Sequence, residues 1–541
     1  MRSIHNSVVY QIYPVSFKDS NHDGIGDLQG IISKLDYLET LGVDMLWLTP
    51  IFPSPLYDNG YDVADYCKIS ERFGTMDDFK ELVHKAKEKH IGIMLDMVFN
   101  HTSTDHTWFQ KALNKEKKYM DYYIFTKEKV NWESKFGGNA FEYVDELGMY
   151  YLHLFDKHQA DLNWDNPEVR QELYKIVHFW LDIGVDGFRF DVVNLISKPE
   201  SFEDDFEGDG RRFYTDGPNI HAYLQELNQE SFGQNPNLMT VGEMSSTSIE
   251  NCINYSHKSG KELSMVFNFH HLKVDYPNNQ KWALGKLDFF ALKKLFNDWQ
   301  TQMQEGGGWQ ALFWCNHDQP RIVSRFGNEH QYHKESAKML ATVIHLQRGT
   351  PYIYQGEEIG MTNAHFDTMD KYRDIESLNH YQILKDRGLS HDEVMQIIME
   401  RSRDNSRTPV QWDDQDFAGF SDVQPWIDVI DNYKTINVQQ SMEDPNSIFA
   451  YYQKLIMLRK KHEVIQTGWY SPLLQDHPRV YAFLRELENK AIYVYANFFE
   501  EDVSIEIDAT LHVLLSNYST STLSPSYTLR PYEVLVLSKN L

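Results

Sequence analysis

The stretch "GIMLDMVFN", residues 92–100, is almost continuously apolar, with Asp96 inside it and Asn100 at its end. A strand with one face in water alternates apolar and polar residues. A strand buried on both faces reads as an unbroken apolar run, and such strands belong to parallel sheets covered by helices. The preceding segment, 77–89, carries a helical period of apolar residues. The stretch therefore predicts a βα unit in a buried parallel sheet.

The same alternation of strand and helix extends outward in both directions. Helices are predicted over 28–41 and 167–183. The other strands are predicted at 8–17, 43–48, 185–191, 238–243, 263–268, 311–316 and 351–354. Eight strands alternating with helices predict an α/β protein with a closed (β/α)₈ TIM barrel. A doubly wound open sheet is the alternative, and its dinucleotide-binding form is disfavoured because no GxGxxG follows the first strand.

Two segments depart from this alternation. Residues 101–165 are rich in aromatic, polar and glycine residues, which predicts an inserted subdomain after the third strand. After about residue 465 the chain changes to short alternating runs such as "RVYAFLRE" (479–486) and "AIYVYANF" (491–498), which predict a C-terminal antiparallel β domain. We assign residues 1–100 and 166–465 to the barrel, 101–165 to the inserted subdomain and 466–541 to the β domain.

The charge of the chain limits its partners. The 541 residues include 52 Lys and Arg against 79 Asp and Glu, a net charge of −27. Nucleic acid and anionic membranes are therefore poor candidate partners, and an anionic substrate would need a locally basic pocket. The three cysteines form neither a disulfide framework nor a CxxC metal pair. No secretory signal or membrane-spanning run is recognisable, so we expect a soluble cytoplasmic protein.

Several functional side chains stand at the ends of the predicted strands, where barrel enzymes place their catalytic groups. They are Asn100, His101, Arg189, Asp191, Glu243, His317 and Asp318. Glycoside hydrolysis needs one carboxylate as nucleophile and one carboxylic acid that protonates the leaving oxygen. Arg189 lies two residues before Asp191, so both point to one face of the strand and the arginine keeps Asp191 ionised. The alternative for any one of these acids is that it merely ends a strand, where turn-forming residues are common. Three acids at the ends of three separate strands favour a catalytic role.

These motifs resemble those of the α-amylase family of retaining glycoside hydrolases. The matching segments are "DMVFNH" (96–101), "QADLN" (159–163), "GFRFD" (187–191), "VGEM" (241–244) and "NHDQ" (316–319). The resemblance implies that Asp191 is the nucleophile, Glu243 the general acid/base and Asp318 the stabiliser of the transition state. It also implies that His101, Arg189 and His317 line the glucosyl subsite. A non-catalytic binding subunit is the alternative, and it is disfavoured because all three acids are present.

Two further motifs resemble those of exo-acting α-glucosidases within the family. "DNGYDV" (58–63) and "SRDNSRTPVQW" (402–412) imply that Asp58 and Arg407 cap the non-reducing glucose, with Tyr61 stacked on its ring. A surface loop with Arg–Asp pairs is the alternative for the second motif. Val192, directly after the nucleophile, matches the branch that acts on α-1,6 and α-1,1 bonds.

Three stretches are similar to the phosphotrehalases, the branch that hydrolyses trehalose 6-phosphate to glucose and glucose 6-phosphate. They are "GDGRRFYTDGPNIH" (208–221), "LMTVGEMSSTS" (238–248) and "FNFHHLKVDYP" (267–277). A phosphorylated disaccharide needs cations in the pocket, because arginine binds phosphate through paired hydrogen bonds and lysine adds a point charge. The candidates are Arg211, Arg212, Lys273, Lys281 and Lys286. The alternatives are an oligo-1,6-glucosidase or dextran glucosidase, with the two arginines as solvated charges beside neighbouring acids.

The segment "DSNHDGIGD" (19–27) has the spacing of a metal-binding loop. Oxygen ligands at alternating positions with glycine at the sixth follow the start of an EF-hand calcium loop. The ligands would be Asp19, Asn21, Asp23, the Ile25 carbonyl and Asp27. Position 12 of the loop is Gly30 instead of the usual Glu, so turn-forming Asx residues without metal are the alternative. The resemblance to α-glucosidases implies a structural Ca²⁺ here.

Overall fold

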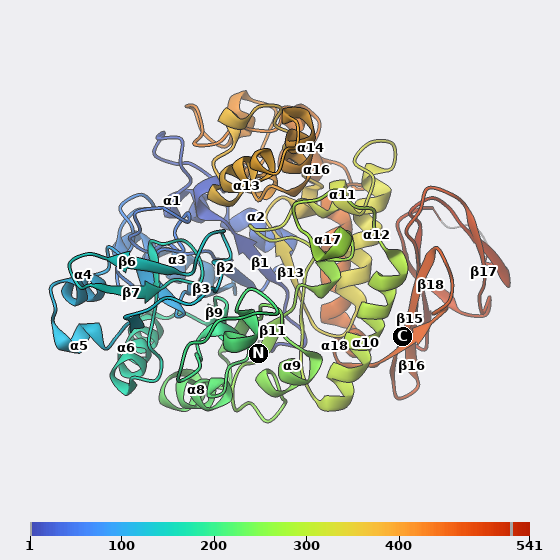
Figure 1. Ribbon diagram of the computed structural model, residues 1–541. Helices are drawn as coiled ribbons and strands as arrows, with labels where there is room; N and C mark the ends of the chain where they lie inside the picture. The colour runs from blue at the N-terminus through green and yellow to red at the C-terminus, as the bar shows by residue number, and fades with distance from the viewer. Residues whose placement is uncertain (1–2, 520–522) are drawn as a thin grey trace. The chain divides into compact units, whose positions relative to one another are not determined.

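The computed structural model describes residues 3–519 and 523–541 (Figure 1). The chain divides into two compact units, one made of residues 1–46 and 270–541 and the other of residues 47–269. No helix in these described ranges is long and apolar enough to cross a membrane.

The unit of residues 47–269 is built on four parallel strands. These are β3 (Gly92–Met97), β9 (Gly187–Phe190), β10 (Met239–Glu243) and β11 (Met265–Phe267), paired in that order. Two of its helices have clear end signals. A capping box at Thr75 starts α3 (Met76–Glu88), and Asn166 caps α6 (Pro167–Ile183), which ends at Gly184 with a left-handed φ of 107°. The fully buried β3 confirms the two-faced burial predicted from "GIMLDM".

The inserted subdomain follows β3 as predicted. Its strands are antiparallel: β4 (His101–Ser103) pairs with β8 (Gln159–Asp161), and β7 (Met149–Leu152) pairs with β5 (Phe125–Thr126) and β6 (Phe141–Val144). Its helices are α4 (Thr107–Leu113) and α5 (Lys117–Met120). Later in this unit come α7 (Arg211–Tyr214), α8 (Ile220–Leu227) and α9 (Ile249–Tyr255). The buried ring of Trp132 stacks on Phe213, so the loop that carries α7 packs on the insert.

The other unit contributes β1 (Val9–Ile12), β12 (Ala311–Leu312) and β13 (Thr350–Tyr354), with β13 parallel to both of the others. Its barrel helices are α1 (Leu28–Ser33), α2 (Leu35–Leu41), α10 (Phe289–Gly306), α11 (Ile322–Arg325), α12 (His333–Leu346), α17 (Ile448–Lys461) and α18 (Glu463–Thr467). With β2 (Met45–Leu48), the sheet has eight strands in the order β11-β10-β9-β3-β2-β1-β13-β12. The predicted barrel class is confirmed.

A helical segment between β13 and α17 was not distinguished from the barrel by the sequence pattern. It contains α13 (Ile375–Asp386), α14 (His391–Arg401), α15 (Asp404–Arg407) and α16 (Val438–Glu443). It has an apolar core of its own, which includes Phe366, Tyr372, Val394 and Ile427.

The C-terminal segment is antiparallel, as predicted. A five-stranded sheet has the order β14-β15-β16-β20-β18, formed by Trp469–Leu473, Val480–Leu487, Lys490–Asn497, Val534–Lys539 and His512–Ser516. A second pair joins β17 (Val503–Glu506) to β19 (Ser526–Leu529). Alternate inward side chains of the two sheets share one apolar core, which includes Val480, Ile505 and Leu537.

Candidate active site

Arg189 is the centre of the acidic cluster in residues 47–269. Its Nη1 lies 2.6 Å from Asp191 Oδ1 and 2.6 Å from Asp96 Oδ1, and its Nη2 contacts Glu243 Oε2. The guanidinium is almost wholly buried, with 1% of the side chain exposed. Arg189 and Glu243 stand on the paired parallel strands β9 and β10, and Asp191 directly follows β9. One buried cation therefore brings Asp191 and Glu243 together, as the strand-end motifs predicted.

Asp96 is the member of this cluster to which the sequence analysis assigned no role. It is fully buried in β3 and accepts hydrogen bonds from Tyr61 Oη (2.9 Å) and Trp47 Nε1 (3.1 Å). Burial raises the pKa of Asp96 to about 7, because the charge of Arg189 only partly offsets the loss of solvent and Asp191 adds repulsion. An ionisable residue inside an otherwise apolar strand was the signal available in the sequence.

The proposed glucosyl-subsite residues of this unit share a hydrogen-bonded network. Gln159 Nε2 lies 3.2 Å from Asp58 Oδ2 and 3.1 Å from His101 Nε2. His101 Nε2 is also 3.0 Å from the Tyr61 carbonyl oxygen. Because burial lowers the pKa of His101, the imidazole is favoured in its neutral form. The structure thus brings Asp58, Tyr61 and His101 together, with Gln159 between them, and Gln159 was quoted in a motif but given no role.

The turn after Asp191 is tight. Val192 has a φ of 34°, in the left-handed region that a β-branched residue rarely adopts. Its side chain packs in the apolar cluster with Trp132 and Tyr214, which fixes the turn directly behind the proposed nucleophile. The preference for α-1,6 or α-1,1 bonds attributed to Val192 stays a prediction.

Asp318 has a different set of neighbours, all in the unit of residues 1–46 and 270–541. Its Oδ1 lies 2.8 Å from Arg407 Nη2 and 3.2 Å from Arg403 Nη1, and its Oδ2 lies 3.2 Å from His317 Nε2. Burial alone would raise the pKa of Asp318, but His317, Arg403 and Arg407 together hold it well below its usual range. Asp318 is therefore an ionised carboxylate over the pH range of ordinary enzymes.

The motif that carries Arg407 is buried, so its alternative explanation as a surface loop is wrong. Arg403 and Arg407 are 6% and 1% exposed. Arg403 binds Asp374 Oδ1 through Nη2 at 2.6 Å and Nε at 2.9 Å. Asp404 accepts hydrogen bonds from the backbone amides of Arg373 and Asp374. Burial raises the pKa of Asp404 to about 6, with repulsion from Asp374 adding to it.

Some of the five cations predicted to bind phosphate already form ion pairs with Asp or Glu side chains. Arg211 lies 2.9 Å from Asp209, and Arg212 lies 3.0 Å from Asp205 and also contacts Glu207; both arginines are about half exposed. Lys281 pairs with Glu376 at 2.7 Å, and its charge also lowers the pKa of Asp318. Lys273 and Lys286 are exposed. A phosphate on the arginine pair would have to displace or share these local carboxylates.

In the loop of residues 19–27, the carboxylates accept hydrogen bonds from backbone amides of the same loop. Asp19 accepts hydrogen bonds from the backbone amides of Asn21, His22 and Gly24 and from Ser421 Oγ. Asp27 caps α1 through the Gly30 amide, and Asp23 Oδ1 accepts the Ile25 amide. Within residues 3–519 and 523–541, no group of three or more His, Cys, Asp or Glu side chains is placed to hold a metal ion.

Paired carboxylates on neighbouring barrel strands, held by one arginine, form an arrangement suited to glycoside hydrolysis. The chain belongs to the α-amylase family, because the model of the α-amylase catalytic domain matches residues 11–468. The trehalose-6-phosphate hydrolase of Bacillus subtilis is 51% identical over 98% of this chain and 97% of its own length, and that of Escherichia coli is 53% identical over 98% of both. The oligo-1,6-glucosidase of Bacillus cereus is 49% identical over 98% of both chains.

A solved structure shows the same fold. The trehalose-6-phosphate hydrolase of Bacillus licheniformis matches with a TM-score of 0.95 and 52% identity over 99% of both chains. These comparisons confirm the resemblance to the phosphotrehalases that the three loop stretches predicted, and they confirm that the chain is an α-amylase-family enzyme.

Proposed function

We propose that this enzyme hydrolyses α,α-trehalose 6-phosphate to glucose and glucose 6-phosphate with retention of configuration at the anomeric carbon. The observation that carries the chemistry is the contact of both Asp191 and Glu243 with the guanidinium of Arg189. Retaining glycosidases hold their two carboxyl groups about 5–5.5 Å apart, a spacing compatible with a shared arginine. The full-length similarity to trehalose-6-phosphate hydrolases supports the substrate.

In the first step, Asp191 attacks the anomeric carbon of the unphosphorylated glucose while Glu243 gives its proton to the departing glycosidic oxygen. Glucose 6-phosphate leaves and a β-glucosyl ester forms on Asp191. Arg189 holds the Asp191 carboxylate in place through an ion pair of 2.6 Å. In the second step, Glu243 takes a proton from water, which attacks the same carbon, releases glucose and restores both carboxyl groups.

Asp318 stabilises the positive charge that develops on the sugar ring in the transition state of each step. Its role follows from its ionised state, which His317, Arg403 and Arg407 maintain. In this proposal, Asp58 and Arg407 bind the hydroxyls of the non-reducing glucose, Tyr61 stacks on its ring, and His101 completes the subsite. The buried hydrogen bonds of Asp58 and His101 to Gln159 hold these groups in fixed orientations.

In this proposal the phosphate is bound by Arg211 or Arg212 and by at least one of the candidate lysines. Lys281 is the member of the candidate set whose charge acts on Asp318. The arginines offer charge-assisted, paired hydrogen bonds, but each already pairs with an acid. Lys273 and Lys286 remain candidates for the remaining phosphate oxygens because both are exposed.

The test is to compare kcat/KM for trehalose 6-phosphate, trehalose and isomaltose, for the wild-type enzyme and for Lys281→Gln and Arg211→Gln/Arg212→Gln. We expect a preference of about 100-fold or more for the phosphorylated sugar, or about 2.7 kcal/mol. The variants should lose this preference through KM and leave trehalose cleavage unchanged. Faster cleavage of isomaltose than of trehalose 6-phosphate would make the enzyme an oligo-1,6-glucosidase, and the arginines would then be solvated charges.

A structural Ca²⁺ in the loop of residues 19–27 is a second proposal. The donor set of Asp19, Asn21, Asp23, the Ile25 carbonyl and Asp27 is all oxygen, which suits Ca²⁺. Asp19 and Asp27 are buried and already oriented by loop amides. Ca²⁺ should raise the melting temperature of metal-stripped enzyme, and Asp23→Ala should abolish that rise. An unchanged melting temperature would leave these residues as turn formers.

We also propose a cytoplasmic location. All three cysteines are unpaired, as is usual for a reducing compartment. Cell fractionation with a periplasmic marker tests this proposal directly.

A further inference from the structure

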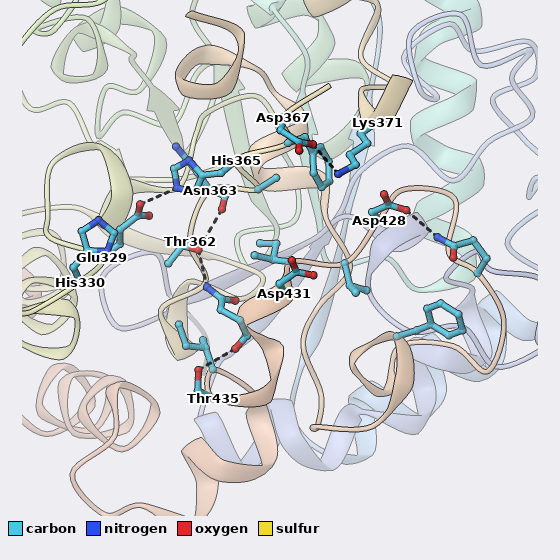
Figure 2. Close-up of a pocket in the computed structure, with 18 residues that line it drawn as sticks. Glu329, His330, Thr362, Asn363, His365, Asp367, Lys371, Asp428, Asp431 and Thr435 are labelled. Atoms are coloured by element: carbon cyan, nitrogen blue, oxygen red, sulfur yellow. Dashed lines mark hydrogen bonds and ion pairs between the residues drawn. The ribbon is translucent and has the colours of Figure 1, made fainter. Parts of the chain in front are cut away.

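A large polar pocket lies in the unit of residues 1–46 and 270–541 and contains none of the residues assigned above to catalysis or substrate binding. Its volume is about 720 Å³, and it is lined by residues 329–330, 362–367, 371, 417, 424, 428–432 and 435–436 (Figure 2). Pockets that bind small molecules span about 300–1,000 Å³, so this one has room for a mono- or disaccharide.

The charge of this pocket disfavours anionic ligands. Its lining includes four carboxylates, one lysine, two histidines and no arginine. The lysine is neutralised, because Lys371 Nζ lies 2.8 Å from Asp367. Figure 2 shows this pair and Asp428 on one side of the pocket, and Glu329 with His365 on the other. A phosphorylated sugar would meet uncompensated negative charge here, in contrast to the proposed substrate site.

The polar groups of the pocket suit a ligand that donates several hydrogen bonds. Asp431 is exposed and makes no hydrogen bond or ion pair with other described residues. Glu329 Oε1 lies 2.8 Å from His365 Nε2, and Asp428 Oδ1 accepts a hydrogen bond of 2.9 Å from Gln424. These carboxylates retain acceptor capacity because an ionised carboxylate has about four lone-pair positions. An apolar ligand would leave them desolvated and unpaired, at a cost in free energy.

The pocket also presents an aromatic ring on an unusual turn. Phe417 lines the pocket, and its φ of 52° is followed by 59° at Ala418, both in the left-handed region. Bulky residues rarely adopt this conformation, and strained residues of this kind gather at ligand clamps. The turn is held by hydrogen bonds from the backbone amides of Trp412 and Asp413 to the Ala418 carbonyl. The turn thus keeps a partly exposed apolar ring among hydrogen-bond acceptors.

We propose that this pocket is a second carbohydrate site, which binds an uncharged mono- or disaccharide. Sugar hydroxyls donate hydrogen bonds to carboxylates, and the apolar face of a pyranose ring packs on an aromatic ring. A metal ion is a poorer occupant, because two of the four carboxylates, Glu329 and Asp367, already pair with His365 and Lys371. The inference does not depend on which glucoside the catalytic site cleaves.

The experiment places a fluorescent reporter at the rim of the pocket. Thr435→Cys is introduced in a Cys67→Ser background, because Cys67 is half-buried whereas Cys252 and Cys315 are buried. An environment-sensitive thiol dye is attached, and the full-length enzyme is titrated with glucose, trehalose, glucose 6-phosphate and CaCl₂. The matched control carries the dye at Thr510→Cys, an exposed position in the C-terminal β domain.

We expect a saturable signal with glucose or trehalose at the Thr435 position and none at the control position. Binding of glucose 6-phosphate should be at least about tenfold weaker, because of the carboxylates. Phe417→Ala with Asp431→Asn should abolish the signal and leave kcat/KM for trehalose 6-phosphate unchanged. The proposal is overturned by a signal that survives in that double variant, by a response to CaCl₂ alone, or by no saturable response to either neutral sugar.

Discussion

Asp96→Asn is the substitution that best tests the Arg189 cluster. Asp96 binds Arg189 Nη1 at 2.6 Å and accepts hydrogen bonds from Tyr61 and Trp47. Asparagine has nearly the same shape but carries no charge, and its amide group adds donors. The variant therefore removes one of three carboxylates from a buried arginine and leaves Asp191 and Glu243 to share it.

The expected loss in transition-state stabilisation is that of one charge-assisted hydrogen bond, about 1.5–3 kcal/mol. That loss corresponds to a decrease in kcat/KM of about 10- to 150-fold.

The effect of Asp96 on the stability of the folded enzyme depends on pH. Because burial raises the pKa of Asp96 to about 7, the folded state binds a proton that the unfolded state releases near pH 4. The contribution of Asp96 to stability is therefore full below about pH 4 and is lost as the pH rises through about 7.

Asparagine cannot ionise, so the variant lacks this pH dependence. The free energy of unfolding of the wild-type enzyme should fall relative to Asp96→Asn between pH 4 and 7.5, by up to about 4 kcal/mol. Urea titrations at four pH values measure this difference, with Asn166→Ala as a destabilised control that keeps Asp96. A constant difference between the wild type and Asp96→Asn across this range would refute the assignment of a raised pKa. Unchanged kcat/KM would refute the role of Asp96 in holding Arg189.

Three other substitutions test separate parts of the structure. Asp191→Asn should abolish turnover of every glucoside without lowering the melting temperature in differential scanning fluorimetry; residual turnover above trace level would place the nucleophile elsewhere. Arg403→Lys should reduce kcat/KM by about 10- to 100-fold. Burial raises the pKa of Asp374, but Arg403 and Arg407 outweigh burial and hold this pKa well below its usual range. As the solution is acidified, the variant should therefore lose stability at a higher pH than the wild-type enzyme. Gly210→Ala places a Cβ 2.3 Å from Trp132 Cγ at a φ of 92°, so it should destabilise the enzyme by about 1–3 kcal/mol in urea titrations; no destabilisation would show that the loop carrying Arg211 does not pack as described.

Most of the barrel was predictable because each strand is short, apolar and bounded by turn residues. Helix 167–183 was predicted to the residue, since Asn166 and Pro167 mark its start and Gly184 its end. Strand 8–17 was predicted too long: β1 ends at Ile12, and Pro14 opens a short 3₁₀ turn. The apolar residues Val15 and Phe17 are buried in that turn, so burial did not distinguish strand from turn there.

Only part of the proposed site could be predicted from the sequence. Strand-end positions located Arg189, Asp191 and Glu243, because parallel strands bring their ends together. Asp96 lies inside its strand, so position alone gave no signal for its contact with Arg189. The pairing of Arg211 with Asp209 and of Arg212 with Asp205 depends on the fold of the loop of residues 203–210, which residue spacing does not specify.

The two groups of acids differ in how many cations accompany them, and this difference matches their proposed tasks. Arg189 faces Asp96, Asp191 and Glu243, so three carboxylates share the charge of this one arginine. Within this group the pKa of Asp96 is raised, because its burial outweighs its share of the arginine charge. Asp318 instead contacts two arginines and a histidine, which together hold its pKa well below its usual range. A permanently ionised carboxylate suits the stabilisation of an oxocarbenium-like transition state. The distribution of arginines therefore agrees with the roles proposed above, proton transfer by Glu243 in one group and charge stabilisation by Asp318 in the other.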